Sequence, residues 1–322
     1  MKRIFRIAVS AVMLLCLLPL PSLAAELLIP IGQVIGLHLS DNTVTIAAFD
    51  DTCGGAARDA GLRIGDEIVA IDGCPIDCAE DVRAALTRKE TPVSVQIRRG
   101  GKKLDFTVPP QMTKDGLRLG IYLKQGITGI GTVTWYDPET GTFGTLGHGV
   151  SDSGGSLLKL VQGSAFEAEI LSVKKGKRGE PGLLKGGAEQ MTVCGTLLRN
   201  TPQGVFGKTD RGWKGEPMPV AEYSELREGP ATILSTVRNK GPQEYSVEIL
   251  KIYPQDRSDH RNLLLKVTDP ALLEATGGIV QGMSGSPIIQ NGKLIGAVTH
   301  VLVNDPTRGY GIFIENMLTA AS

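Results

Sequence analysis

The heptapeptide QGMSGSP, residues 281–287, is the part of this sequence best suited to chemistry, because it holds a serine between glycines just before an apolar strand. A hydroxyl nucleophile must stand on a tight, exposed turn to reach a carbonyl carbon, and Gly282 and Gly285 permit such a turn. The backbone amides of Gly282 and Ser284 would hold the oxyanion that forms during attack. The segment therefore predicts Ser284 as a nucleophile, with Gly282 and Ser284 as its oxyanion hole.

A base for this serine is present in a second glycine-rich loop, GTLGHGVSD, which carries His148. Serine attacks poorly at neutral pH unless a base takes its proton, and imidazole titrates in the range that makes this transfer efficient. An aspartate bonded to the other ring nitrogen would fix the tautomer and stabilise the imidazolium. Asp269 lies between the two residues in sequence. We therefore predict a catalytic triad of His148, Asp269 and Ser284.

Two aspartates compete for the place of the acid. Asp269 precedes Ser284 by only 15 residues, so it would reach His148 only if it ended a strand beside the histidine loop. Asp152 follows His148 by four residues and could support it from the same loop, although an aspartate in that position also caps turns. The sequence favours Asp269 and leaves Asp152 as the alternative.

The other histidines carry weaker signals. His300 lies in the apolar run GAVTHVLV, which is typical of a histidine in the core or at the edge of a sheet rather than of a second base. His38 and His260 have no chemically suggestive neighbours in the sequence. We expect His300 to be structural.

The elements that must position these residues follow from the β-rich pattern of residues 113–322. Apolar or alternating runs recur there between glycine, proline and charged turns, which is typical of a sandwich or a pair of barrels. After Ser284, an apolar run ends at Asn291 and Gly292, a strong type I′ turn signal, so a hairpin supports the nucleophile loop. The last apolar run, residues 309–314, resembles the position at which trypsin-like enzymes pair a substrate backbone, so we expect substrate to add there as a strand, with a buried structural strand as the alternative.

Residues 26–112 predict a separate α+β unit. Asp77 and Glu80 have the spacing of a capping box, and Val82 and Leu86 share one face of the helix that would follow. Two strands, residues 93–98 and 104–108, flank a glycine turn. The stretch AARDAGLRIGDEIVAIDGCPI, residues 56–76, resembles the core of bacterial PDZ domains.

The resemblance to PDZ domains implies a peptide site. Such modules bind an extended peptide as an added strand and hold its C-terminal carboxylate on the amides of a glycine loop. In this sequence the expected loop is GQVIGL, with Gly32, Ile35, Gly36 and Leu37 as the binding residues. The alternative is a PDZ fold that serves only as a spacer.

The first 25 residues have the pattern of an export signal. Lys2, Arg3 and Arg6 precede an apolar run that ends near a small-residue cleavage site at Ala24 and Ala25. The apolar run is shorter than the roughly 20 residues of a membrane span, although an uncleaved anchor is the alternative. Without these three basic residues the balanced charge of 34 basic and 34 acidic residues becomes mildly acidic, which disfavours nucleic acid as a partner.

Four cysteines follow the export signal, at positions 53, 74, 78 and 194. A disulfide among Cys53, Cys74 and Cys78 and a set of unpaired thiols are both compatible with an oxidising compartment. Cys74 and Cys78 have the spacing of a metal pair but no second Cys or His pair beside them. We expect neither a metal nor a cofactor.

Two long stretches closely resemble the stage IV sporulation protein B peptidases. They are GTVTWYDPETGTFGTLGHGVSD, residues 131–152, and TGGIVQGMSGSPIIQNGKLIGAVTHVLVNDPTRGYGIFIENML, residues 276–318. The resemblance implies a mainly β fold: a membrane-targeting start (residues 1–25), a PDZ domain (residues 26–112) and a trypsin-like double β-barrel serine peptidase domain (residues 113–322). Carried over to matching positions, the family's catalytic residues fall on His148, Asp269 and Ser284.

The same resemblance implies a signalling peptidase of endospore-forming bacteria. Such an enzyme would be exported to the space between the mother cell and forespore membranes, with anchoring by its N-terminal segment as the alternative to its release. It would cleave itself and cut a membrane-associated regulator of an intramembrane protease, leading to activation of a sigma factor. A PDZ-led peptide-binding protein with an inactive peptidase body and an esterase with the same triad are the alternative functions.

Overall fold

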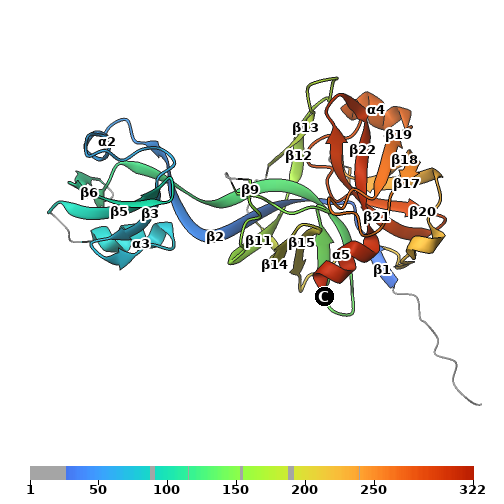
Figure 1. Ribbon diagram of the computed structural model, residues 1–322, viewed down its shortest axis with the longest axis horizontal. Helices are drawn as coiled ribbons and strands as arrows, with labels where there is room; N and C mark the ends of the chain where they lie inside the picture. Colours follow the sequence, from blue (N-terminus) through green and yellow to red (C-terminus); the bar gives the residue numbers. More distant parts are fainter. Residues whose placement is uncertain (1–26, 88–90, 115, 153–154, 188–191, 239) are drawn as a thin grey trace, which may run out of the picture.

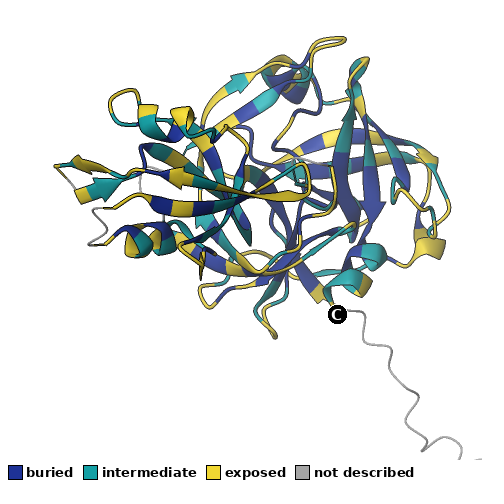
Figure 2. Cartoon of the chain, turned by 60° about the vertical axis from the view of Figure 1, so that its left-hand side comes forward, coloured by how far each residue is buried: buried dark blue, intermediate teal, exposed yellow. Residues whose placement is uncertain are grey.

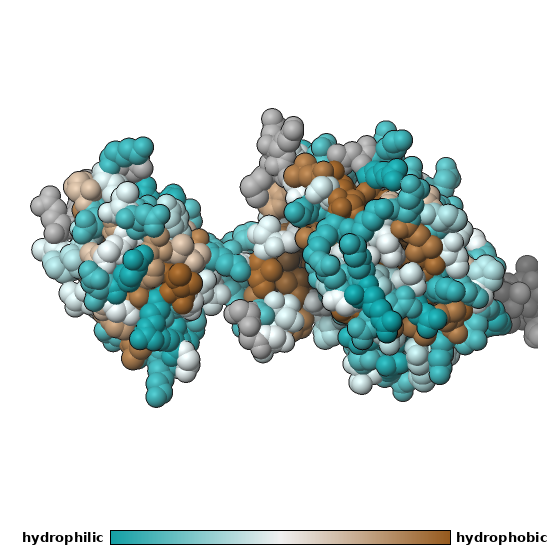
Figure 3. Space-filling view, turned by 90° about the horizontal axis from the view of Figure 1, so that it is seen from above, coloured by the Kyte–Doolittle hydropathy of each residue, from teal (hydrophilic) through white to brown (hydrophobic). Residues whose placement is uncertain are grey.

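The computed structural model describes residues 27–87, 91–114, 116–152, 155–187, 192–238 and 240–322. It has a small lobe and a larger body joined by two long strands (Figure 1). In the space-filling view the connection between them is narrow (Figure 3). The expected export signal lies outside the described residues, and within them no helix is long and apolar enough to cross a membrane.

The small lobe is the α+β unit whose sequence resembles PDZ domains, and we call it the PDZ unit. Its apolar core includes Val44, Ile68, Val82 and Ile97. Its elements, besides parts of the two connecting strands, are α2 (Gly55–Asp59), β3 (Glu67–Ile71), β4 (Cys74–Pro75), α3 (Ala79–Leu86), β5 (Val93–Arg99), β6 (Lys102–Val108), β7 (Gln111–Thr113) and β8 (Gly116–Arg118). The predicted glycine turn joins β5 to β6, as expected.

The start of α3 differs by one residue from the prediction. Cys78 is the N-cap, and the carboxylate of Asp81 accepts the backbone N–H groups of Asp77 and Cys78 at 2.9 and 3.0 Å. The capping box therefore uses Cys78 and Asp81 in place of Asp77 and Glu80. A shift of one residue is possible because a second acidic side chain is adjacent to the expected one.

The connecting strands are β2 (Val34–Phe49) and β9 (Ile121–Tyr136), which pair antiparallel in both lobes. A bulge interrupts their register between Leu39 and Val44, opposite Gly126, whose φ is +69°. On the body side of this bulge, β2 also pairs with a strand of the body. Strand pairing thus inserts the PDZ unit between two strands of the body, whereas the expected division at residue 112 makes the two units consecutive.

The first barrel of the body contains the inner halves of β2 and β9. They close a ring with β10 (Thr142–Thr145), β15 (Gly204–Lys208), β14 (Val193–Thr201) and β11 (Gln162–Glu167). β1 (Leu27–Pro30) pairs with β9 and with β16 (Met218–Pro219). A hairpin of β12 (Glu169–Lys174) and β13 (Leu183–Gly187) projects from this barrel toward the second one (Figure 1).

The second barrel is closed by strands from the C-terminal third. In order around the ring they are β17 (Gly229–Ser235), β18 (Gln243–Ile252), β19 (Leu263–Val267), β22 (Asp305–Phe313), β21 (Lys293–Leu302) and β20 (Pro287–Gln290). A 3₁₀ turn (η1, Tyr223–Glu225) precedes the barrel, α4 (Pro270–Thr276) follows β19, and α5 (Ile314–Ala321) ends the chain. In Figure 2 much of these strands has the dark blue of buried residues. The predicted double β-barrel is confirmed.

Candidate active site

Ser284 lies on a turn that both barrels hold in place. Its carbonyl oxygen accepts the N–H of Thr132 from β9 at 2.9 Å, and Gly285 N–H donates to Val298 O on β21 at 2.7 Å. Gly285 has a φ of +97°, and a Cβ there would lie 2.0 Å from the carbonyl oxygen of Thr132. Only glycine fits this position, so the turn that presents the serine is fixed at the junction of the barrels.

The backbone amides next to the serine are available to an anion. Gly282 has a φ of +98°, and its carbonyl oxygen accepts the Thr132 hydroxyl at 2.9 Å. Within the described part of the chain, the N–H groups of Gly282 and Ser284 donate to no other residue. Two such amides on one turn have the composition of an oxyanion hole.

His148 follows β10 in a loop that packs against the second barrel. Gly147 has a φ of +67°, and a Cβ at this position would lie 2.8 Å from the Thr299 side chain and 2.9 Å from that of Ile312. The close approach brings the histidine to β21. Burial lowers the pKa of His148 below its ordinary value of 6.5, so the imidazole is neutral at neutral pH.

The tautomer of His148 is set by a main-chain oxygen. Nδ1 lies 2.9 Å from the carbonyl oxygen of Gly149. A carbonyl only accepts, so Nδ1 carries the proton and donates, and Nε2 is left as the acceptor. A neutral ring with an accepting Nε2 is the form that a general base requires.

One cavity of about 370 Å³ contains both His148 and Ser284 at the junction of the barrels. Ser284 Oγ donates to Thr299 O at 2.7 Å, so its hydroxyl must turn before it can donate to the imidazole. Hydrogen bonds between catalytic groups are often long before substrate binds. The cavity is lined by Leu37, Leu39, Ile127, Gly129, Ile130, Leu146, His148, Val150, Ile279, Val280, Gln281, Gly282, Ser284, Thr299, His300 and Val301.

Asp269 does not lie in this cavity. It is the N-cap of α4: one carboxylate oxygen accepts the N–H of Ala271 at 2.9 Å and of Leu272 at 3.0 Å, and the other accepts Ser246 N–H at 3.4 Å. The structure therefore does not bring Asp269 to His148. The sequence does contain a signal for this role, because an aspartate followed by proline is typical of an N-cap and the first helical residue.

Asp152 is also engaged elsewhere. Its carboxylate accepts the N–H of Ser156 at 3.0 Å, and its own N–H donates to Ser156 O at 2.8 Å. It closes a turn after the histidine loop and is not among the residues that line the cavity. No Asp or Glu is found among the described residues that line the cavity.

His300 is the functional candidate that sequence reasoning missed. Its ring lies in the same cavity, with its centroid 5.0 Å from that of the His148 ring and the planes inclined by 42°. Strand periodicity gives no sign of this contact, because the neighbour comes from the other barrel. The expectation that His300 is only structural does not account for its position.

The strand expected to pair with substrate has no free edge. Residues 309–311 of β22 pair with β19 on one side and β21 on the other, and residues 312 and 313 pair with β21. The expectation for residues 309–314 was therefore wrong, because a strand inside a closed barrel cannot accept another partner. On β21, pairing with β20 ends at Ala297, and Thr299, His300 and Val301 line the cavity beyond it.

The residues expected to bind a peptide carboxylate lie in, or just before, the part of β2 that pairs within the first barrel. Gly36 on β2 pairs with Ile130 of β9 and with Phe166 of β11, and Leu37 is buried in the core of the first barrel. Ile35 is fully buried, and Gly32 bonds Val133 O through its N–H. Ile35, Gly36 and Leu37 lie in a strand whose two edges are already paired, and Gly32 lies in the segment before it, so the structure does not show the expected carboxylate-binding loop at these residues.

The four described cysteines are free thiols. Cys194 is buried in the first barrel, and burial raises the pKa of its thiol to about 11. In the described ranges, no group of three or more His, Cys, Asp or Glu side chains is arranged to hold a metal ion.

Two protein families match the chain. The profile of the SpoIVB peptidase S55 family covers residues 115–318, and that of the PDZ domain covers residues 34–109.

Curated relatives share a shorter region. "Putative zinc metalloprotease R01501" of Rhizobium meliloti (strain 1021) is 34% identical over 122 residues, which are 38% of this chain and 30% of that protein. A protein of Agrobacterium fabrum (strain C58) with a name of the same kind is 35% identical over 99 residues, 30% of this chain and 25% of that protein. The chain spans less than a third of the length of these relatives.

Solved structures of proteases also resemble the chain. The HtrA-type protease AlgW with a decapeptide is 13% identical, with 64% of this chain and 56% of that chain covered and a TM-score of 0.37. The active form of the Rv3671c protease from M. tuberculosis is 15% identical, with 62% of this chain and 75% of that chain covered and a TM-score of 0.35. Similarity at this level says nothing about the chemistry of this chain.

Proposed function

The chain belongs to the SpoIVB peptidase S55 family, and we propose that it is an exported signalling serine endopeptidase in which Ser284 is the nucleophile and His148 the base. The observation that supports this assignment most directly is the cavity between the barrels. It contains a neutral imidazole with an accepting Nε2, a serine on a glycine turn and two unengaged amides.

The reaction follows from this arrangement. Ser284 Oγ leaves Thr299 O and attacks the scissile carbonyl carbon, while His148 Nε2 takes its proton. The N–H groups of Gly282 and Ser284 hold the oxyanion of the tetrahedral intermediate. His148 then gives its proton to the leaving amine, and a water molecule deprotonated by the same nitrogen releases the acyl group.

The lining of the cavity favours substrates with apolar side chains around the scissile bond. Leu37, Leu39 and Ile127 line it from the first barrel, and Ile279 and Val301 from the second. No charged side chain is present among its described lining residues, apart from the histidines, which are neutral at pH 7. A charged substrate side chain would lose its water here without gaining a partner, which is costly.

The signalling role is carried by the family resemblance rather than by the cavity. We propose that the enzyme acts in sporulation between the mother cell and forespore membranes, where it cleaves itself and a membrane-associated regulator of an intramembrane protease. The PDZ unit supports this role as a site for peptide C-termini. The PDZ unit is inserted between β2 and β9, and residues of both strands also line the cavity, which supports a link between peptide binding and the active site.

Incubation of the purified full chain tests the proposal. We expect self-cleavage and covalent labelling by a fluorophosphonate, both abolished in Ser284→Ala. Ser286→Ala is the matched control, because this neighbouring serine is buried and donates to Ser235 Oγ at 2.9 Å. Labelling that persists in Ser284→Ala would exclude this nucleophile, and turnover of small esters without peptide cleavage would indicate an esterase.

A further inference from the structure

We propose that His300 is a positioning residue that holds the imidazole of His148 in place and keeps its surroundings uncharged while Ser284 is activated. The inference rests on the proposed role of His148 as the base. It assigns to a second histidine part of the work that an aspartate performs in a triad.

The need for such a residue follows from the contacts of His148. Its ring has one hydrogen-bond partner in the described structure, the carbonyl oxygen of Gly149, and no carboxylate is among the groups that shift its pKa. A single hydrogen bond allows an imidazole to tilt about the bond, so a second contact is needed to fix its plane. The ring of His300, 5.0 Å away, is that contact.

The hydrogen bonding of His300 differs from that of an ordinary core histidine. Its Nδ1 is buried and has no hydrogen-bond partner among the residues that the structure describes. Buried polar atoms are almost always paired, so each exception needs an explanation. Its backbone belongs to β21, paired with Tyr310 on β22, so the ring stands on a rigid strand.

Burial is the main reason that His300 is neutral, and nearby charged groups modify its effect. Besides His148, they are Arg261 and Asp259, from the loop between β18 and β19. Burial, followed by His148 and Arg261, lowers the pKa of His300 to about 4, while Asp259 acts in the opposite direction. His300 therefore carries no charge in the pH range in which His148 exchanges protons with Ser284.

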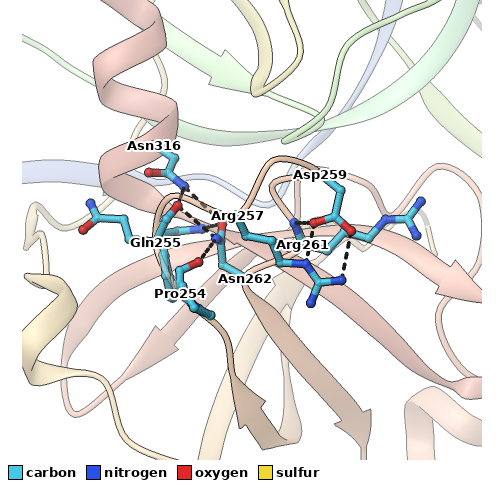
Figure 4. Close-up of polar contacts among 8 residues, drawn as sticks. Pro254, Gln255, Arg257, Asp259, Arg261, Asn262 and Asn316 are labelled. Atoms are coloured by element: carbon cyan, nitrogen blue, oxygen red, sulfur yellow. Dashed lines mark hydrogen bonds and ion pairs between the residues drawn. The ribbon is translucent and has the colours of Figure 1, made fainter.

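The loop that carries these groups is itself well held (Figure 4). Asp259 accepts Arg257 Nε at 2.6 Å and Arg261 N–H at 3.1 Å, and the Arg261 guanidinium lies 5.3 Å from the centre of the Tyr310 ring. Asn262 donates to the carbonyl oxygens of Pro254 and Gln255 at 2.8 and 3.2 Å. The electrostatic setting of His300 is thus built into the fold.

A neutral ring beside the base favours the transition state. When Ser284 loses its proton to Nε2, His148 becomes a cation, and a second cation beside it would oppose the transfer. The face of a neutral aromatic ring instead attracts a cation. His300 gains and loses no proton in this step.

The experiment compares His300→Leu with His300→Phe in the full chain, using a peptide substrate. For His300→Leu we expect kcat to fall about 10- to 100-fold with KM within about twofold, because the ring contact is lost at the transition state. The acid limb of the kcat/KM profile should move to lower pH, because the imidazolium loses its aromatic neighbour. His300→Phe should recover most of the rate.

His38→Leu is the matched control. His38 lies on β2 between the cavity residues Leu37 and Leu39, and alternation along the strand turns its side chain to the opposite face, where its Nε2 lies 3.0 Å from Gln125 O. This variant should keep the wild-type kcat and pH profile.

Wild-type kcat and an unmoved acid limb in His300→Leu would overturn the inference, as would a change in KM alone. If His300→Leu does not fold, NMR titration of the histidines in Ser284→Ala with and without His300→Phe provides the test. We expect His300 to stay unprotonated above pH 5, and its protonation near pH 6.5 would contradict the inference. Activity retained in His148→Ala would instead overturn the base assignment itself.

Discussion

The N-terminus of α4 and the cavity face of β21 belong to the same barrel, but they use polar side chains in opposite ways. At α4, the hydrogen bonds of the Asp269 carboxylate to the described residues all come from backbone N–H groups, as in an ordinary helix cap. On β21, His300 has a buried nitrogen without a partner beside the candidate base. A polar group whose bonds are satisfied locally stabilises the fold, whereas one left unsatisfied next to a nucleophile is suited to function.

Removal of the base should have the largest effect on activity. We expect His148→Ala to lower kcat by about 10⁴- to 10⁶-fold, because Ser284 then has no proton acceptor. In the wild type, kcat/KM should rise with pH through the pKa of His148 and level off below neutral pH, since burial lowers that pKa. Peptide kinetics from pH 4 to 8 measure the kcat of His148→Ala and the kcat/KM profile of the wild type. An acid limb of the kcat/KM profile centred above pH 7 would indicate a carboxylate beside His148 and would contradict this prediction.

Gly285→Ala should have the largest effect on stability. The new Cβ would clash with Thr132 O in a left-handed backbone conformation. We expect a loss of more than about 3 kcal/mol in the free energy of unfolding, measured by denaturant titration. Gly292→Ala is a suitable comparison, because Gly292 also has a positive φ but no atom lies near its Cβ position. Equal losses in the two variants would show that the backbone conformation, and not the barrel junction, sets the cost.

Substitutions of Asp269 distinguish a helix cap from a catalytic acid. Asp269→Ala should lower the free energy of unfolding by about 1 kcal/mol, because two helical N–H groups lose their acceptor. Asp269→Asn should cost less, since an amide oxygen also caps, and both variants should keep the kcat of the folded enzyme. A triad acid predicts instead a loss of about 10⁴-fold in the Asn variant. Denaturation and peptide kinetics on the same samples distinguish these roles.

The pH dependence of stability should show the smallest effect. The pKa of His300 is about 4 in the folded protein and near 6.5 when unfolded, so between these values the unfolded chain binds more protons. Stability should therefore fall as the pH falls through this window. Thermal melts should show a shallower decline for His300→Phe than for the wild type, and identical slopes would place His300 in solvent.

Much of the fold could be predicted from the sequence. The β-rich runs, the Asn291 and Gly292 turn and the PDZ core are local patterns, and the structure contains the elements that they predict. The insertion of the PDZ unit could not be predicted in this way. It depends on residues near 35 pairing with residues near 130, and no local pattern records which strands pair across such a distance.

The candidate site was predictable to a similar extent. Ser284 and His148 stand out because glycines around a hydroxyl or an imidazole are needed for the backbone conformation itself, and this need is written in the sequence. Asp269 was assigned by its order in the chain, but its carboxylate bonds nearby N–H groups. His300 was set aside because its neighbours in sequence are apolar, although its decisive neighbour is 152 residues away.

The sequence by itself determined the residue types that can carry the chemistry and the turns that present them, because backbone conformation depends on adjacent residues. Only the tertiary structure decided which side chains meet: it placed two imidazoles together at the junction of the barrels and left the expected acid at the end of a helix. The physical reason is that hydrogen bonding and burial act through space, so partners are chosen by the packing of whole strands rather than by their order along the chain.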